Sequence, residues 1–237
     1  MSNNKLDVRV YPIAEPQGNT LAFASISVDN LVAINSLRVV DSEKGMFVAM
    51  PQSQDNTGIY HDIAFPLTKE LRDNINTAVI SEFAAQLNLY PEQRGYMKSE
   101  QDTRTARSAA DVALDVKVFP INEPRGDTVA FASVGLDDNI AIRGIRVVQS
   151  DKGLFVSMPQ SKDKEGGFHD IAFPLSGDLR KAVSNAILSE YKQHTAERRQ
   201  SVGDQLRDGA DKATQYKTDR AAQPQAAKRS AGNVGLE

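Results

Sequence analysis

Apolar and polar residues alternate along two stretches of the chain, and this period of two is typical of half-buried strands. In the first stretch the alternation is clearest in LDVRVYPI, after which Pro16 and Gly18 turn the chain. The strands that the pattern predicts there lie at residues 6–13, 20–30, 32–45 and 46–53. A polar loop then precedes the short segment HDIAFP, which starts at His61.

Turn residues separate these strands. Asp29-Asn30 follows the second strand, and Asp137-Asp138 holds the same place in the second stretch. Gly45 and Gly153 each follow a lysine, where we expect a turn with a positive φ rather than a phosphate-binding loop.

The spacing of apolar residues then becomes helical. From Leu71 to Phe83, and from Leu179 to Tyr191, apolar residues recur every three or four positions. Thr68 and Ser176 precede these helices as expected N-caps. Strands followed by one helix predict an α+β fold, in which a small antiparallel β-sheet carries a C-terminal helix packed on one face.

The two stretches are copies of one unit. LDVRVYPIAEPQGNTLAFAS at Leu6 returns as LDVKVFPINEPRGDTVAFAS at Leu114, and about 55% of the paired positions are identical through Phe83 and Tyr191. We therefore predict repeat 1 at residues 6–85, repeat 2 at 114–193, and a linker at 86–113. The polar remainder, 194–237, has few bulky apolar residues, so we expect a disordered or weakly helical tail.

Composition excludes several classes of protein. The 237 residues contain no cysteine, and neither an apolar run of transmembrane length nor a secretory leader is visible. We therefore expect a cytoplasmic protein without disulfides. No nucleophile elbow, P-loop or set of metal ligands is visible, so we predict a non-enzymatic protein with no cofactor and no metal.

Charge divides unevenly along the chain. The net charge of −3 hides a division into about −5 in repeat 1, about −2 in repeat 2 and about +3 in the tail, while the linker is nearly balanced. Repeat 2 has gained five basic residues at positions that are neutral or acidic in repeat 1. They are Arg125, Arg143, Lys162, Lys164 and Lys181, in place of Gln17, Asn35, Gln54, Asn56 and Asp73.

Two motifs carry a family resemblance. RVVDSEKGMFVAMPQS followed by HDIAFPL, and RVVQSDKGLFVSMPQS followed by FHDIAFPL, resemble the stage V sporulation protein G family, also called septation protein G. The resemblance covers both repeats almost from end to end. It implies a small cytoplasmic domain that dimerises, affects septation and sporulation, and binds DNA or RNA.

Departures from the family pattern indicate which repeat binds. Family members usually have basic residues after Met-Pro, an Arg before Asp-Ile-Ala, a His before the next Pro, and a basic cluster opening the helix. His61 and His169 replace that Arg, and Phe65 and Phe173 replace that His. Repeat 2 is thus the better candidate for binding nucleic acid, and its expected contacts are Lys162, Lys164, His169, Arg180, Lys181 and Arg146.

Each of these residues also has a plainer interpretation. The lysines fit a solvated loop, and His169 beside Asp170 fits a structural or phosphate-facing histidine better than a catalytic one. Arg146, like Arg38, would either contact a ligand or form an ion pair with Asp62 or Asp170.

The apolar residues of the fourth strand have a separate role in this hypothesis. We expect Phe47, Met50, Phe155 and Met158 in the core or at a dimer interface, rather than as base-stacking platforms. The linker allows the two repeats to pair within one chain as an intrachain pseudo-dimer. The alternative function is a protein-interaction or assembly module, with a septation-related partner and no nucleic acid.

Overall fold

The computed structural model describes residues 4–16, 18–55, 57–87, 108–124, 126–162 and 166–222. The chain divides into two units, residues 1–192 and 193–237. The first unit holds both repeats. Most of the expected linker, residues 88–107, lies outside the described residues.

Each repeat is a set of antiparallel strands followed by one helix, which confirms the α+β prediction. Repeat 1 contains β1 (Leu6–Pro12), β2 (Thr20–Val28), β3 (Val32–Val40), β4 (Phe47–Ala49), β5 (Gln52–Gln54), β6 (Tyr60–Asp62), β7 (Ala64–Pro66) and α1 (Lys69–Leu87). A 3-10 turn, η2 (Ala109–Asp111), precedes repeat 2. Repeat 2 contains β8 (Leu114–Pro120), β9 (Thr128–Leu136), β10 (Ile140–Ser150), β11 (Gly153–Ser157), β12 (Gln160–Lys162), β13 (Phe168–Asp170), β14 (Ala172–Pro174) and α2 (Gly177–Ala222).

Local signals in the sequence produce the predicted turns and caps. Asp29 and Asn30 both have a φ of 53°, which suits the tight turn between β2 and β3. Gly45 has the expected positive φ, 105°. The Thr68 hydroxyl accepts a hydrogen bond from the N–H of Leu71 at 3.2 Å, and the Ser176 hydroxyl accepts one from the N–H of Leu179 at 3.1 Å. Thr68 and Ser176 therefore cap α1 and α2.

A hairpin forms around the polar loop of each repeat, and in repeat 1 it takes up the end of the strand predicted at 46–53, which the structure divides into β4 and β5. β5 pairs with β6 and β12 with β13, each as a separate two-stranded sheet. The residues of β5 and β12 are all exposed. A ribbon without a buried face leaves no hydrophobic alternation in the sequence, which explains why the pattern did not predict this hairpin as a separate pair of strands.

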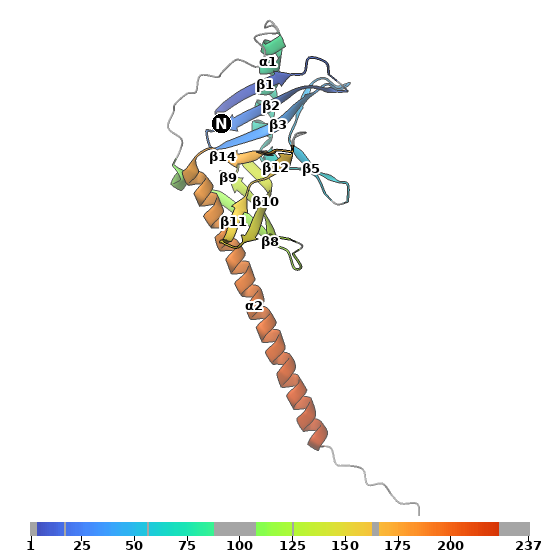
Figure 1. Ribbon diagram of the computed structural model, residues 1–237, viewed down its shortest axis with the longest axis vertical. Coiled ribbons are helices and arrows are strands. Elements are labelled where there is room, and N and C mark those ends of the chain that lie inside the picture. The colour runs from blue at the N-terminus through green and yellow to red at the C-terminus, as the bar shows by residue number, and fades with distance from the viewer. Residues whose placement is uncertain are drawn as a thin grey trace, which may run out of the picture. The chain divides into compact units, whose positions relative to one another are not determined.

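The two repeats exchange their last strands. β14 of repeat 2 pairs with β3 of repeat 1 (Figure 1). In the same way β7 of repeat 1 pairs with β10 of repeat 2. The registers are equivalent, because Ala172 faces Ile34 and Ala64 faces Ile142. Each repeat thus completes the other's sheet.

Further backbone hydrogen bonds extend both exchanges. The N–H of Asn35 donates to the carbonyl of Ile171 and that of Arg143 donates to Ile63, each at 2.7 Å. The N–H groups of Leu67 and Leu175 donate to the opposite repeat at 2.7 and 2.8 Å. This reciprocal pairing satisfies backbone groups that would otherwise line two open sheet edges.

One continuous hydrophobic core spans both repeats. The inner sheet faces supply Ile34 and Ile142, both fully buried, and the helices supply apolar residues at their predicted spacing. The helix residues in the core are Leu71, Ile75, Val79, Phe83, Leu179, Val183 and Ile187.

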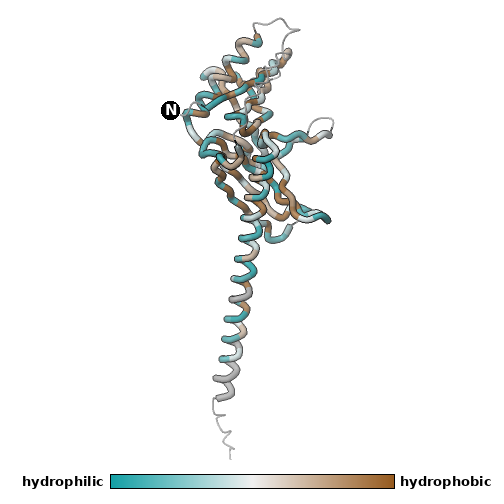
Figure 2. Tube along the Cα trace, turned by 90° about the vertical axis from the view of Figure 1, so that its left-hand side faces the viewer, coloured by the Kyte–Doolittle hydropathy of each residue, from teal (hydrophilic) through white to brown (hydrophobic). Residues whose placement is uncertain are grey.

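The last helix continues past repeat 2. α2 ends at Ala222, so it covers much of the segment that we expected to be disordered or weakly helical, while residues 223–237 lie outside the described ones. Beyond residue 192 its positions are mostly hydrophilic (Figure 2), and Leu206 is 70% exposed. Within the described residues, no helix combines the length and apolar character that crossing a membrane requires.

Candidate nucleic-acid interface

In repeat 2 one carboxylate joins the hairpin to the start of the helix. Gln160 Nε2 donates to Asp170 Oδ1 at 2.9 Å across the β12–β13 ribbon. Arg180 Nη2, in the first turn of α2, donates to Asp170 Oδ2 at 3.1 Å. The hairpin and the start of the helix are therefore held side by side.

The pleat of this hairpin separates two of the predicted residues. Lys162 is opposite Phe168, and its Nζ lies 5.8 Å from the ring centroid, within reach of a cation–π contact. Lys162 and Asp170 occupy the same face of the ribbon, whereas His169 lies between Phe168 and Asp170 and projects from the other face. Lys162 and Arg180 thus share a face from which His169 is excluded.

The two basic residues of the helix start are both in ion pairs. Arg180 binds Asp170 and also lies 5.8 Å from the centroid of Phe173. Lys181 Nζ lies 3.9 Å from Asp178 Oδ1, and the two side chains are 80% and 87% exposed. A pair so exposed is weak, so Lys181 can exchange Asp178 for a phosphate at little cost.

Arg146 lies on the main sheet rather than on the hairpin. It stands in β10 between Phe131 and Ser157, and its Nη2 donates to Ser157 Oγ at 3.3 Å. Of the two alternatives for Arg146, the ion pair with Asp170 is not the arrangement found: Arg146 bonds Ser157, and Asp170 is bound by Arg180 and Gln160, so a ligand contact stays a prediction. Lys164 lies outside the described residues.

Repeat 1 has the same scaffold with a different charge. Gln52 Nε2 donates to Asp62 Oδ1 at 2.8 Å, and Arg72 lies 3.9 Å from the other oxygen. Asp73, at the position of Lys181, binds Lys69 and raises the pKa of that lysine. The position equivalent to Lys162 is neutral, so this copy offers a phosphate little attraction.

A compact polar network closes the repeat 1 hairpin. The Thr57 hydroxyl donates to Asp55 Oδ1 at 2.6 Å, and His61 Nε2 lies 2.8 Å from Asp55 Oδ2. The Thr57 hydroxyl, the His61 ring, and the N–H groups of Ile59 and Thr57 together hold the pKa of Asp55 well below its ordinary value of 3.8.

We expect the Asp55 turn to withstand mild acid. Because the folded pKa is lowered, the stabilisation exists above pH 3.8 and is lost only as the pH falls through the lower folded pKa. The carboxyl carbon chemical shift in an NMR titration should still report an ionised Asp55 at pH 3.8. Thr57→Val with His61→Ala should move the midpoint toward 3.8, and a midpoint already there in the native chain would contradict the prediction.

The predicted core positions of the fourth strand divide into two groups. Met50 and Met158 are buried, at 4% and 3% exposure. Phe47 and Phe155 are 43% and 47% exposed, so the core alternative is wrong for them, whereas the dimer-interface alternative stays a prediction. Phenylalanine and methionine are three residues apart, and an odd offset along an extended chain puts two side chains on opposite faces.

Four more exposed aromatic residues were absent from the predicted sites. Tyr11, Phe23, Phe119 and Phe131 are between 46% and 58% exposed, on the sheet faces away from the core. The signal was present in the motif Ala-Phe-Ala, because the flanking alanines at 22, 24, 130 and 132 are buried and force the phenylalanine outward.

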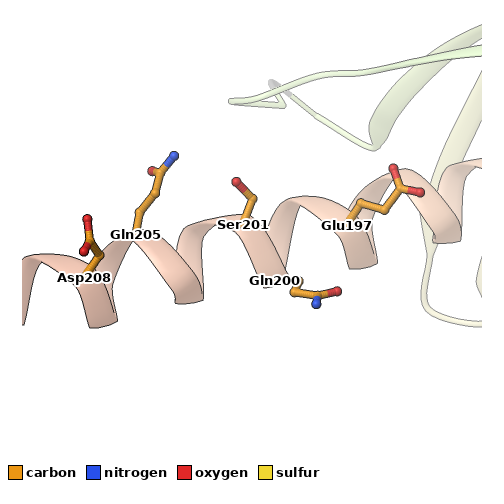
Figure 3. Close-up of a pocket in the computed structure, with 5 residues that line it drawn as sticks. All are labelled: Glu197, Gln200, Ser201, Gln205 and Asp208. Carbon is orange, nitrogen blue, oxygen red and sulfur yellow. The ribbon is translucent and has the colours of Figure 1, made fainter.

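The hollow on the extended part of α2 does not resemble a binding site. Figure 3 shows a hollow lined by Glu197, Gln200, Ser201, Gln205 and Asp208, all of them on α2, so a single helix wall borders it. Throughout the described ranges, no three His, Cys, Asp or Glu side chains gather in a way that could hold a metal ion.

Comparison with known proteins gives the same match twice along the chain. The family model SpoVG matches residues 4–85 and 112–193. A septation protein SpoVG of Bdellovibrio bacteriovorus is 42% identical over 79 residues, which are 33% of this chain and 71% of that protein. Its counterpart in Myxococcus xanthus is 40% identical over 80 residues, 34% of this chain and 79% of the relative. The chain therefore belongs to the SpoVG family, and it carries two copies of the family's domain in tandem.

Proposed function

We propose that this chain is a non-enzymatic cytoplasmic regulator of the septation and sporulation type, which binds DNA or RNA mainly through repeat 2. The two relatives carry the name septation protein, and this supports a role of the chain in septation. The observation that carries nucleic-acid binding is the charge difference between two matched sites: Lys162 and Lys181 in repeat 2 replace Gln54 and Asp73 in repeat 1.

The geometry of repeat 2 favours a phosphate ligand. Lys162 projects from the hairpin face that adjoins the start of α2, and Lys181 is exposed in the first turn of that helix. The helix N-terminus adds its own positive potential at this place. Asp170 neutralises part of the charge of Arg180. That arginine therefore serves mainly to hold the hairpin against the helix.

We further propose that the two repeats act as an intrachain pseudo-dimer. The reciprocal exchange of β7 and β14 and the shared core support this, because each repeat gives the other the same segment in the same register. One copy of the pair then keeps a basic site while the other has lost it.

A charge exchange between the repeats tests the binding site. We expect Lys162→Gln with Lys181→Asp to weaken binding of labelled DNA or RNA by about tenfold at low salt, and to reduce the salt dependence by about two phosphate contacts. The reverse change in repeat 1, Gln54→Lys with Asp73→Lys, should strengthen binding. Fluorescence anisotropy at two salt concentrations measures both.

The control is Lys152→Gln, which removes an exposed lysine from the turn between β10 and β11, away from the hairpin. It should change binding little. Unaltered affinity in the Lys162 and Lys181 variant, or a native chain that binds no nucleic acid at low salt, would refute the proposed site.

One observation favours the alternative, an assembly module without nucleic acid. Repeat 1 has a net charge of about −5, and at the start of its helix Lys69 is already paired with Asp73. A septation-related protein that copurifies with the full chain after nuclease treatment, together with absent DNA and RNA binding, would support this alternative.

A further inference from the structure

Both repeats present a row of aromatic rings and a guanidinium across the outer face of the sheet. In repeat 2, Phe119 of β8 is opposite Phe131 of β9, which is opposite Arg146 of β10. In repeat 1 the same register places Tyr11, Phe23 and Arg38 on β1, β2 and β3. Neighbouring strands lie about 4.8 Å apart, so the three side chains of a row stand side by side.

A further aromatic residue stands on the same face. Phe155 of β11 is opposite Val148, two residues beyond Arg146 and therefore on the outer side of β10. Phe47 has the same relation to Val40 and Arg38. The six aromatic rings of the two faces are between 43% and 58% exposed, and no part of the described chain buries them.

A lysine beside the row distinguishes the face of repeat 2 from a protein-docking surface. Protein interfaces are enriched in aromatic residues and arginine, but they are depleted of lysine. In the row adjacent to Phe119, Phe131 and Arg146, Lys117 stands opposite Ser133, and repeat 1 has a second arginine, Arg9, opposite Ser25. Lys117 is 3.5 Å from Asp115, an exposed pair that a stronger anion can displace.

A surface on which aromatic rings alternate with cationic side chains suits a nucleic-acid strand, in which phosphates join the bases. An aromatic side chain stacks on any base, an arginine stacks and also binds phosphate, and sheet faces of this kind hold two or three unpaired bases. Bases in a duplex are stacked on one another and cannot reach a flat sheet face. The occupant that fits is thus a single strand.

We propose that the outer face of each sheet is a stacking platform for single-stranded nucleic acid, formed by Phe119, Phe131, Arg146 and Phe155 in repeat 2 and by Tyr11, Phe23, Arg38 and Phe47 in repeat 1. This rests on the proposed nucleic-acid binding and deepens it. Unlike the hairpin lysines, the platform residues are retained in both repeats, so repeat 1 contacts bases although it has lost its basic site.

Affinity measurements on the full chain test the platform. Phe119→Ala with Phe131→Ala should weaken binding of a labelled oligothymidine by about tenfold to a hundredfold, because each lost stacking contact has a large effect. The salt dependence should stay unchanged, since no charge is removed. Phe131→Tyr should bind the oligothymidine with native affinity, because it keeps an aromatic ring. Phe131→Leu should bind it more weakly than the native chain does.

A tryptophan probe reports stacking directly, since the chain contains no tryptophan. Fluorescence of a Phe131→Trp variant should be quenched by oligothymidine and much less by a duplex of equal length. Leu206→Trp, at an exposed position on α2, should show no such difference. Native thermal unfolding of each variant checks that the fold is kept.

The possible outcomes separate the two proposals. If the native chain binds no nucleic acid at low salt, the proposed function fails and the platform fails with it. If it binds, but the phenylalanine variants keep full affinity and Phe131→Trp is not quenched, only the platform is refuted. A changed oligomeric state of Phe119→Ala with Phe131→Ala in light scattering would assign the face to protein contact and overturn the inference.

Discussion

Expressed alone, each repeat should form a dimer. A fragment of residues 6–85 lacks β14, so the backbone of β3 from Val32 to Ile34 has no partner on one side. Unpaired backbone groups at a buried edge are costly, and an open edge recruits another strand. A second copy can supply it, because HDIAFPL is identical at residues 61–67 and 169–175.

Light scattering with size-exclusion chromatography measures this outcome. Repeat 1 and repeat 2, expressed separately, should each have twice the mass of one fragment, and the full chain should have the mass of one chain. The linker favours the intrachain partner, since it holds the repeats at roughly millimolar effective concentration. A folded, monomeric single repeat would contradict the exchange, as would a full chain that forms dimers or tetramers by exchanging repeats between chains.

Local structure could be predicted from the sequence because local interactions determine it. The alternation of Val10, Ala22 and Ala24 with exposed residues records which sheet face is buried, and Thr68 and Ser176 mark the helix starts. The exchanged strands could not be predicted in this way. HDIAFPL is the same in both repeats, so no pattern tells which copy of the sheet the segment joins.

The candidate site was predictable in its charges but not in their partners. Comparing the repeats shows that repeat 2 gained lysines. It does not show that Asp170 binds Arg180 and Gln160, or that the hairpin pleat turns His169 away from Lys162. Both contacts depend on the register in which β12 and β13 pair. Because this ribbon has no buried face, the hydrophobic pattern of the sequence does not indicate its register.

The tail was predictable only in outline. Few apolar residues follow repeat 2, which indicated a disordered or weakly helical segment. α2 takes the helical alternative as far as Ala222, along a sequence rich in residues with good helix propensity. Side chains four residues apart add support, with Gln193 donating to Glu197 at 3.1 Å and Lys212 to Asp208 at 2.7 Å.

Removing one core side chain should destabilise both repeats together. Ile142 is fully buried, is opposite Ala64 of the exchanged strand and Val134 of its own sheet, and belongs to the core that both repeats share. Ile142→Ala should lower the free energy of unfolding by about 2–5 kcal/mol. Ile34→Ala, its counterpart in repeat 1, should have a similar effect.

A shared core and two reciprocal strand pairings leave neither repeat a complete sheet of its own, so the two repeats should unfold in a single transition. Urea titration followed by the amide NMR signals of each repeat measures this, and the two sets of signals should disappear at one midpoint that Ile142→Ala shifts for both. Leu206→Ala, at a 70% exposed position, should change the stability by about 0.5 kcal/mol or less. If Ile142→Ala unfolds repeat 2 while the signals of repeat 1 keep their native midpoint, the repeats are independent domains, and the exchanged strands contribute little to holding them together.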